Sequence, residues 1–179
     1  MTKTRSIPDW YAADWTPARG RGELPPMTWN AVEEIIADSR LPPSRKDRAK
    51  ALFRTLWLES SALSPLELLQ RFLIVGAVAF DPGRAGQSKV GILPTPASGP
   101  LPRWSFTDVE VALSCTWSGM ALFIATERHH DLLERRGETL SAQDTVRLIV
   151  LLVAGLPAPR SVRSEAQPVI ASRETRAAA

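Results

Sequence analysis

Five helix-start signals along the chain constrain its fold more than any other feature of the sequence. Each is a Ser or Thr that can cap the first turn of a helix, and each is followed by a run with a helical pattern. The strongest is Ser64-Pro65-Leu66-Glu67, a capping box in which proline takes the first helical position. The capping candidates are Thr28, Ser44, Ser64, Thr107 and Ser141. These signals predict a mainly α fold, a compact helical domain of about five helices.

The expected helices cover residues 29–39, 45–60, 65–79, 107–136 and 141–155. Thr107 and Glu110 have the capping-box spacing, so we begin the fourth helix at residue 107, with Gly119 placed to bend it. The third helix is apolar almost all round after Arg71, which is typical of a buried helix. Its second half, residues 72–80, fits a buried strand equally well because short apolar runs are ambiguous.

The chain changes character between residues 81 and 105. Five Pro and four Gly fall between Asp81 and Trp104, which excludes a helix there and predicts a loop. Val90 to Leu93 forms a candidate strand that would pair with part of 72–80 across the intervening turn. A short β-hairpin between residues 72 and 106 is therefore the one β element that we allow for.

Two tryptophans stand in a proline-rich stretch before the first helix, and we assign residues 1–27 to an extended N-terminal arm. Trp10 and Trp15 are five residues apart, a spacing that suits neither one face of a helix nor one face of a strand. Two interpretations remain open with equal weight: the arm packs across its own domain, or it docks on a partner, where Trp is a frequent hot spot. Asp9 and Asp14 precede the two tryptophans and complete the predicted partner-binding set.

The remaining domain boundaries follow from composition. A helical core domain is expected over residues 28–156. The tail at 157–179 holds four Arg, two Glu and few large apolar residues, so we expect it to be basic and disordered. Flexible termini on a compact helical centre are the predicted organisation.

Apolar patterning and cysteine usage limit where the protein acts. The chain has no uninterrupted apolar run of about 18 residues, so no transmembrane segment is expected. Its start, MTKTRSIPDW, lacks the apolar centre of a signal peptide. Cys115 is the single cysteine, which excludes an internal disulfide and a cysteine-based zinc site. We expect a cytoplasmic location, intracellular and reducing.

Groups that carry catalysis or bind metals are not apparent in the sequence. His129 and His130 are adjacent on a helix and point about 100° apart, so they are interpreted as surface histidines rather than as a metal pair. Cys115 lies in an apolar run and is predicted to be a buried, inert thiol. The loop at 83–89 lacks the glycine and lysine spacing of a phosphate-binding loop. We therefore expect no enzyme activity, no catalytic or metal-binding residue and no cofactor.

Basic residues cluster at the start of the second predicted helix and form the candidate polyanion-binding site: Arg45, Lys46, Arg48, Lys50 and Arg54. One interpretation is a solvated helix face; the other is contact with phosphates of nucleic acid or with an anionic membrane surface. The chain carries 22 Lys and Arg against 19 Asp and Glu, and only four of the 22 are Lys. A GC-rich genome or an overlapping reading frame also favours Arg, so part of this excess reflects nucleotide composition.

The stretch LPRWSFTDVEVALSCTW, Leu101 to Trp117, resembles the strand-to-helix entry of rhabdovirus matrix proteins. Those proteins have an Arg, an aromatic and a small hydroxyl residue, followed by Asp-Val opening a helix that ends near a Trp. The resemblance implies a small basic protein that works by self-association and by binding surfaces. The proline-rich late motif of that family is missing, since Pro25-Pro26-Met27-Thr28 stands where it would be.

These observations lead to one functional expectation and one alternative. We expect a non-catalytic assembly or adaptor protein that acts through protein–protein contacts and a basic surface, with a protein partner or a second copy of itself. A viral or mobile-element structural or accessory protein fits this description and would act in the host cell or the virion. The alternative is a nucleic-acid-binding regulator that uses the basic helix at 45–60.

Overall fold

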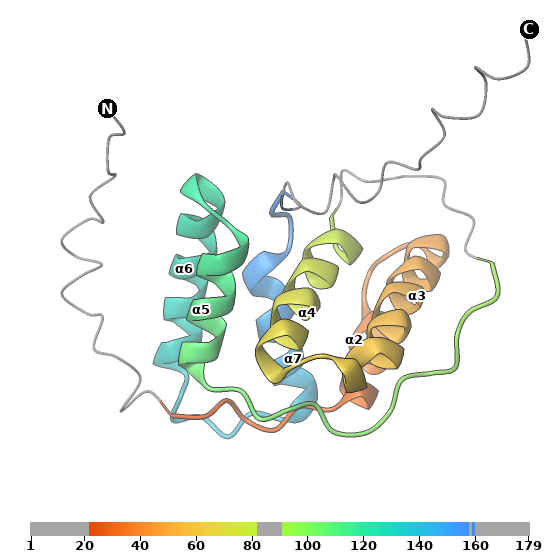
Figure 1. Ribbon diagram of the computed structural model, residues 1–179, viewed down its shortest axis with the longest axis horizontal. Coiled ribbons are helices and arrows are strands. Elements are labelled where there is room, and N and C mark those ends of the chain that lie inside the picture. Colours follow the sequence, from red (N-terminus) through yellow and green to blue (C-terminus); the bar gives the residue numbers. More distant parts are fainter. Residues whose placement is uncertain (1–21, 82–90, 158, 160–179) are drawn as a thin grey trace, which may run out of the picture.

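The computed structural model describes residues 22–81, 91–157 and 159 of the chain (Figure 1). Within these residues the chain forms six α-helices and one short 3-10 turn, η1, at Ser60–Ala62. The helices are α2 (Trp29–Asp38), α3 (Pro43–Glu59), α4 (Pro65–Ala79), α5 (Phe106–Thr116), α6 (Gly119–Glu134) and α7 (Ala142–Val153). The prediction of a mainly α fold built on a compact helical domain is confirmed.

The helices form two layers of three. In the view of Figure 1, α5, α4 and α3 lie in front, and α6, α7 and α2 lie behind them. The packing agrees with this arrangement, since α4 contacts α3, α5 and α7, while α7 contacts α2, α4 and α6. A domain of this kind buries one apolar face of every helix between the layers. The two central helices, α4 and α7, bury the most.

The core centres on α4 and on the aromatic side chains around it. The ring of Phe72 lies 5.2 Å from that of Phe53, 5.9 Å from Trp104 and 6.0 Å from Trp29, between ring centroids. The Trp104 indole N–H also donates a hydrogen bond to the Pro65 carbonyl at 2.8 Å. Tilted aromatic pairs at these distances stabilise a core beyond the area that they bury.

The strand alternative for residues 72–80 is wrong, because residues 72–79 continue α4. The capping box at Ser64 stabilises the N-terminus of α4. The Ser64 N–H and hydroxyl both donate hydrogen bonds to the Glu67 carboxylate, and these bonds lower the pKa of Glu67. Gly76 lets α7 approach closely, since a Cβ at this position would lie 3.4 Å from a Val153 methyl carbon. Val90, one end of the other candidate strand, lies outside the described residues.

Two extended segments pair in the structure, but they are not the two segments that the sequence predicts to pair. Residues 22–28 run antiparallel to residues 99–105 across one end of the helices, at the bottom of Figure 1. The Leu24 N–H donates to the Trp104 carbonyl at 2.9 Å, and the Leu101 N–H donates to the Met27 carbonyl at 3.0 Å. Leu24 and Met27 are buried. Residues 22–27, which the sequence places in the arm, are therefore part of the folded domain.

Three of the five predicted caps are observed. Thr28 accepts a hydrogen bond from the Ala31 N–H, Ser64 from the Glu67 N–H and Ser141 from the Asp144 N–H. Ser44 is not a cap, because α3 begins at Pro43 without a side-chain cap.

The N-cap of the helix expected from residue 107 lies two residues earlier than predicted, at Ser105 instead of Thr107. Ser105 caps α5, and its capping box is completed by Asp108 rather than by Glu110. This register directs Phe106, Val109 and Leu113 into the core. Ser105 with Asp108 and Thr107 with Glu110 both have the capping-box spacing, and burial of these apolar side chains favours the first.

The predicted single helix at 107–136 is wrong, because the chain breaks at Trp117 and Ser118 into α5 and α6. Gly119 begins α6 with a φ of 61°, a conformation that glycine adopts without strain. Trp117 is buried, and its indole N–H donates to the Pro157 carbonyl at 2.9 Å. The break lets α6 fold back on α5 and pack against α7 as well.

Candidate functional site

The predicted partner-binding residues of the arm, Asp9, Trp10, Asp14 and Trp15, lie outside the described residues. Their role therefore stays a prediction. The described structure does contain the other predicted cluster, the basic residues of α3, and it separates them into two groups.

Arg54 is not part of an exposed basic face, because it joins α3 to α2 and to the loop at 94–97. Its side chain is 10% exposed, and it donates through Nε and Nη2 to the two carboxylate oxygens of Glu33 at 2.7 and 2.9 Å. A third bond runs from Nη1 to the Pro94 carbonyl at 2.9 Å. The Ala97 N–H donates to the same carboxylate at 3.2 Å. We therefore remove Arg54 from the predicted polyanion-binding set.

Glu33 ionises more readily than an ordinary glutamate. Burial opposes its ionisation, but the hydrogen bonds from Arg54 and from the Ala97 N–H outweigh burial and lower the pKa below its usual 4.5. The hydrogen bonds to Glu33 in turn raise the pKa of Arg54. Glu33 and Arg54 thus form a charged clamp whose function in the described structure is to hold the domain together.

The other four basic residues stay on or near the surface of α3. Lys46 donates from Nζ to the Ala37 carbonyl at 2.6 Å, so it caps the C-terminal end of α2. Arg45, Arg48 and Lys50 are each partly buried. These four residues remain the predicted polyanion surface, with one of them already bound to a helix end.

His129 and Cys115, both predicted to be unreactive, differ from the prediction in how far they are exposed to solvent. His129 is buried rather than exposed, with Nδ1 3.6 Å from Glu110 Oε1 and its ring centroid 6.2 Å from that of Phe106. Cys115, predicted to be buried, is exposed near the end of α5. Cys115 is exposed because it lies on the face of α5 opposite the buried Phe106 and Val109. His129 is buried because the break after α5 turns α6 back against α5.

The described residues contain neither a cluster suited to a metal ion nor a helix suited to spanning a membrane. In this part of the chain no three His, Cys, Asp or Glu side chains come together in a way that would hold a metal ion. None of the helices among residues 22–81 and 91–157 is long and apolar enough to cross a membrane.

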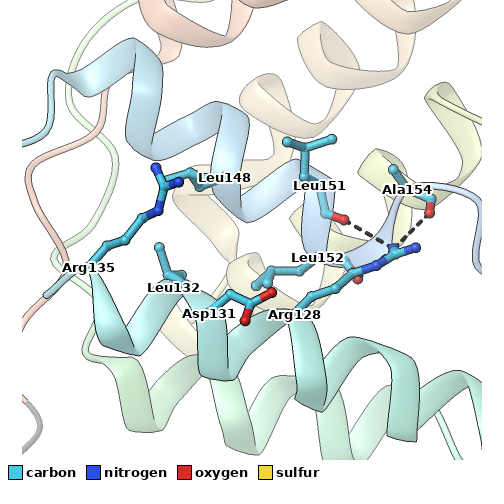
Figure 2. Close-up of a pocket in the computed structure, with 8 residues that line it drawn as sticks. All are labelled: Arg128, Asp131, Leu132, Arg135, Leu148, Leu151, Leu152 and Ala154. Atoms are coloured by element: carbon cyan, nitrogen blue, oxygen red, sulfur yellow. Dashed lines mark hydrogen bonds between the residues drawn. The ribbon is translucent and has the colours of Figure 1, made fainter.

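A concave surface among the described residues lies between α6 and α7 (Figure 2). It encloses about 380 Å³, and Figure 2 shows α6 side chains on one wall and α7 side chains on the other. We call it the α6–α7 groove and define it by its lining residues, Arg128, Asp131, Leu132, Arg135, Leu148, Leu151, Leu152 and Ala154. Four leucines make its floor and rim apolar, and the three charged side chains are Arg128 and Asp131 of α6 and Arg135, the residue that follows α6.

Arg128 fixes one end of this groove by binding the C-terminal end of α7. Its Nη1 donates to the carbonyls of Leu151, Leu152 and Ala154 at 3.1, 3.2 and 2.9 Å. The last carbonyls of a helix have no partner within the helix and carry partial negative charge, so an arginine here is favourable. The two walls are thereby held at a set distance, and the guanidinium lies at the mouth of the groove.

Leu151 is the ridge of this surface. It is 51% exposed, although Ile149, Val150, Leu152 and Val153 around it are buried. A second hollow of about 140 Å³ lies on its other side and shares Leu151 and Ala154 with the groove. The remaining residues that line it are Ile35, Asp38, Ser39, Phe80, Arg147 and Val150. Together the two hollows form one surface on both sides of an exposed leucine.

Sequence reasoning missed this site because the apolar run at 148–153 reads as core throughout. The one available signal was the spacing of Asp144, Arg147, Leu148 and Leu151, which follow the i, i+3, i+4, i+7 pattern of one helix face. This helix face begins with charged residues, so its first turn is exposed to solvent. The apolar residues that follow on the same face are then candidates for contact with another molecule. Only the position of α6 shows that the apolar part borders a groove.

Comparison of the chain with protein-family models, with curated proteins and with solved structures finds no match in any of the three.

Proposed function

We propose that the protein is a non-catalytic adaptor that holds an apolar, acidic segment of a partner protein in the α6–α7 groove. The observation that carries the proposal is the half-exposed Leu151 between two hollows, on a helix whose other leucines are largely buried. A half-exposed leucine flanked by concave surface on both sides gains about 1 kcal/mol when an apolar group covers it, about half of the gain for a fully exposed leucine. The expected assembly or adaptor function rests on such contacts.

The shape of the surface favours a peptide segment as the ligand. The groove has the volume of a small-molecule site, about 380 Å³, but the second hollow continues it across α7. A ligand that covers Leu151 must cross this ridge and contact both hollows. An extended segment or an amphipathic helix does so with side chains at regular spacing, as in the helix-in-groove mode of recognition.

The charges at the rim favour acidic residues in that segment. Arg128 and Arg135 flank the groove, and Arg147 borders the second hollow. Asp131 and Asp38 oppose them with two negative charges, and Asp38 accepts a hydrogen bond from Gln143 at 3.1 Å. Arg147 is already paired with Asp144 at 3.3 Å, so the net positive charge belongs to the groove itself, where Arg128 and Arg135 face Asp131. Asp or Glu beside the apolar side chains of the partner would be attracted there.

A peptide library displayed on phage tests the proposal without a known partner. Selection on the wild-type protein should enrich peptides that combine two or more apolar residues with Asp or Glu. Leu151→Glu should weaken the binding of the enriched peptides about tenfold or more, because it removes the apolar ridge and repels the acidic residues. Leu58→Glu is the matched control, since Leu58 is an exposed leucine on α3, away from the groove.

The outcomes separate the adaptor proposal from its alternatives. Peptides that bind Leu151→Glu as tightly as they bind wild type would exclude the groove as the binding site. If no acidic, apolar peptide is enriched, the adaptor proposal fails, and the nucleic-acid-binding regulator becomes the better hypothesis. The viral or mobile-element setting, with a matrix-like role, is part of the proposal only through the resemblance at Leu101 to Trp117.

A further inference from the structure

The outward face of α6 carries two apolar side chains followed by three acidic ones. Met120 is 71% exposed and Phe123 is 46% exposed. Glu127, Asp131 and Glu134 follow at spacings of four, four and three residues, and all three are exposed. Spacings of three and four place these five residues on one strip along the helix. We call it the α6 strip; it is apolar at the N-terminal end of α6 and acidic towards the C-terminal end.

The described chain begins beside the acidic end of this strip. The Gly22 carbonyl accepts a hydrogen bond from the Phe106 N–H at 3.3 Å, at the start of α5. The Phe106 ring in turn lies 6.2 Å from the ring of His129, in the C-terminal half of α6. A segment that leaves Gly22 towards the N-terminus and follows α6 therefore meets acidic residues first and apolar residues afterwards.

The sequence before Gly22 has the complementary order. Arg21 and Arg19 come first, and Trp15 and Trp10 follow farther out. We propose that residues 8–21 dock along the α6 strip, with the two arginines facing its carboxylates and the two tryptophans covering Phe123 and Met120. The occupant is a segment of this chain itself, and the strip differs from the α6–α7 groove in all its residues except Asp131, which borders both.

The distances allow this contact. Seven residues separate Trp15 from Gly22, which spans about 23 Å when extended. Along α6, Phe123 lies about 9 Å from the level of His129, and Met120 about 14 Å from it. His129 is buried, on the side of α6 away from the strip, so the segment must also pass around the helix, whose diameter with side chains is about 10 Å. The length available, about 23 Å, covers both distances to Phe123.

Tethering favours the chain's own arm over a partner or a second copy. A segment joined by a short linker has an effective concentration in the millimolar range, well above that of a free partner. Pro8 and Pro17 lower the conformational entropy that the segment loses on docking. The opposite charges of the arginines and the carboxylates set the direction in which it lies.

Tryptic cleavage after Arg19 and Arg21 tests the docking. The full chain should be cleaved there about tenfold more slowly than a double variant, Met120→Glu with Phe123→Glu, since tenfold protection corresponds to a contact worth 1.4 kcal/mol. Both side chains are exposed, so the variant should keep the fold, which circular dichroism checks. Leu58→Glu is the matched control and should keep the wild-type protection. Equal cleavage rates in wild type and the double variant would overturn the proposal.

A spin label on Cys115 gives a second, direct measurement. Cys115 is the single cysteine of the chain, it is exposed, and it lies five residues before Met120. A nitroxide there should broaden the indole N–H signals of Trp10 and Trp15, and that of the nearby Trp117. The signal of Trp57, on α3 at the other side of the domain, should stay sharp.

Two results of this measurement would refute docking within one chain. The first is unbroadened Trp10 and Trp15 signals beside a broadened Trp117 signal. The second is equal broadening in a mixture of spin-labelled chains and isotope-labelled chains without a spin label, since this would assign the contact to a second copy.

Discussion

Arg54→Met should be among the most destabilising single substitutions of a charged residue in this domain. The change keeps much of the side-chain length but removes a guanidinium that makes three hydrogen bonds, two to Glu33 and one to the Pro94 carbonyl. It leaves the Glu33 carboxylate at 18% side-chain exposure, with the Ala97 N–H as its remaining donor among the bonds described above.

The magnitude follows from the burial of the pair. Removal of one partner from a fully buried ion pair costs about 3–5 kcal/mol, because the other charge is left without compensation. The two side chains here keep 10% and 18% of their exposure, so water reaches Glu33 in part, and we take the lower end, about 3 kcal/mol. With an m-value of about 2 kcal/mol per molar urea, the denaturation midpoint should fall by about 1.5 M.

Urea denaturation followed by circular dichroism measures this shift. The matched control is Arg71→Met, which breaks an exposed pair with Glu59 whose side chains are 54% and 51% exposed. That change should cost under about 1 kcal/mol, because exposed pairs contribute little. The reasoning would be refuted if Arg54→Met shifted the midpoint no more than Arg71→Met does.

The same pair predicts a pH dependence. The pKa of Glu33 is lowered in the folded protein, so the carboxylate stabilises the fold at pH values above its ordinary 4.5. This stabilisation is lost as the pH falls from 4.5 through the lower, folded-state pKa. Wild type should therefore lose more stability than Glu33→Gln over this acid range, and parallel stability curves for the two proteins would contradict the assignment.

Three further predictions address the helix boundaries and the basic surface. Ser105→Ala should lower the free energy of unfolding by about 1 kcal/mol and Thr107→Ala by much less, and the opposite order would mean that α5 begins at the later box. Gly119→Ala should cost about 1–2 kcal/mol through its positive φ, and an unchanged thermal midpoint would contradict the break between α5 and α6. Replacing Arg45, Arg48 and Lys50 together by Glu should abolish binding to DNA, RNA or anionic vesicles and leave the fold intact. Binding by the wild type should weaken steeply with salt. If the wild type binds none of these at low ionic strength, this surface is not a polyanion-binding site.

The sequence by itself determined those features whose physical cause lies within a few residues. The cap at Ser64 needs only its own hydroxyl, the Glu67 N–H and the Glu67 side chain, so its spacing in the sequence was sufficient. The same holds for the caps at Thr28 and Ser141. These three confirmed caps, among five predicted, lie within single turns of the chain, so they predicted a helical domain without any knowledge of the contacts between helices.

Tertiary structure decided the features that depend on residues far apart in the chain. Two capping boxes compete at the start of α5, and burial of Phe106 and Val109 selected Ser105 over Thr107. Arg54 lies in a basic run, but the carboxylate that holds it is 21 residues away and the carbonyl that completes its bonding is 40 residues away. The local pattern of a helix is the same whether its charged face meets water or another helix.

The candidate site followed the same division. The apolar run of α7 was evident in the sequence, and its helical character was predicted. That Leu151 stays half exposed while Leu152 is buried depends on where α6 lies, and α6 reaches that place only because the chain breaks at Trp117 and Ser118. Helix formation is a local equilibrium that the sequence sets, whereas the choice of which apolar side chain stays exposed belongs to the packing of all six described helices.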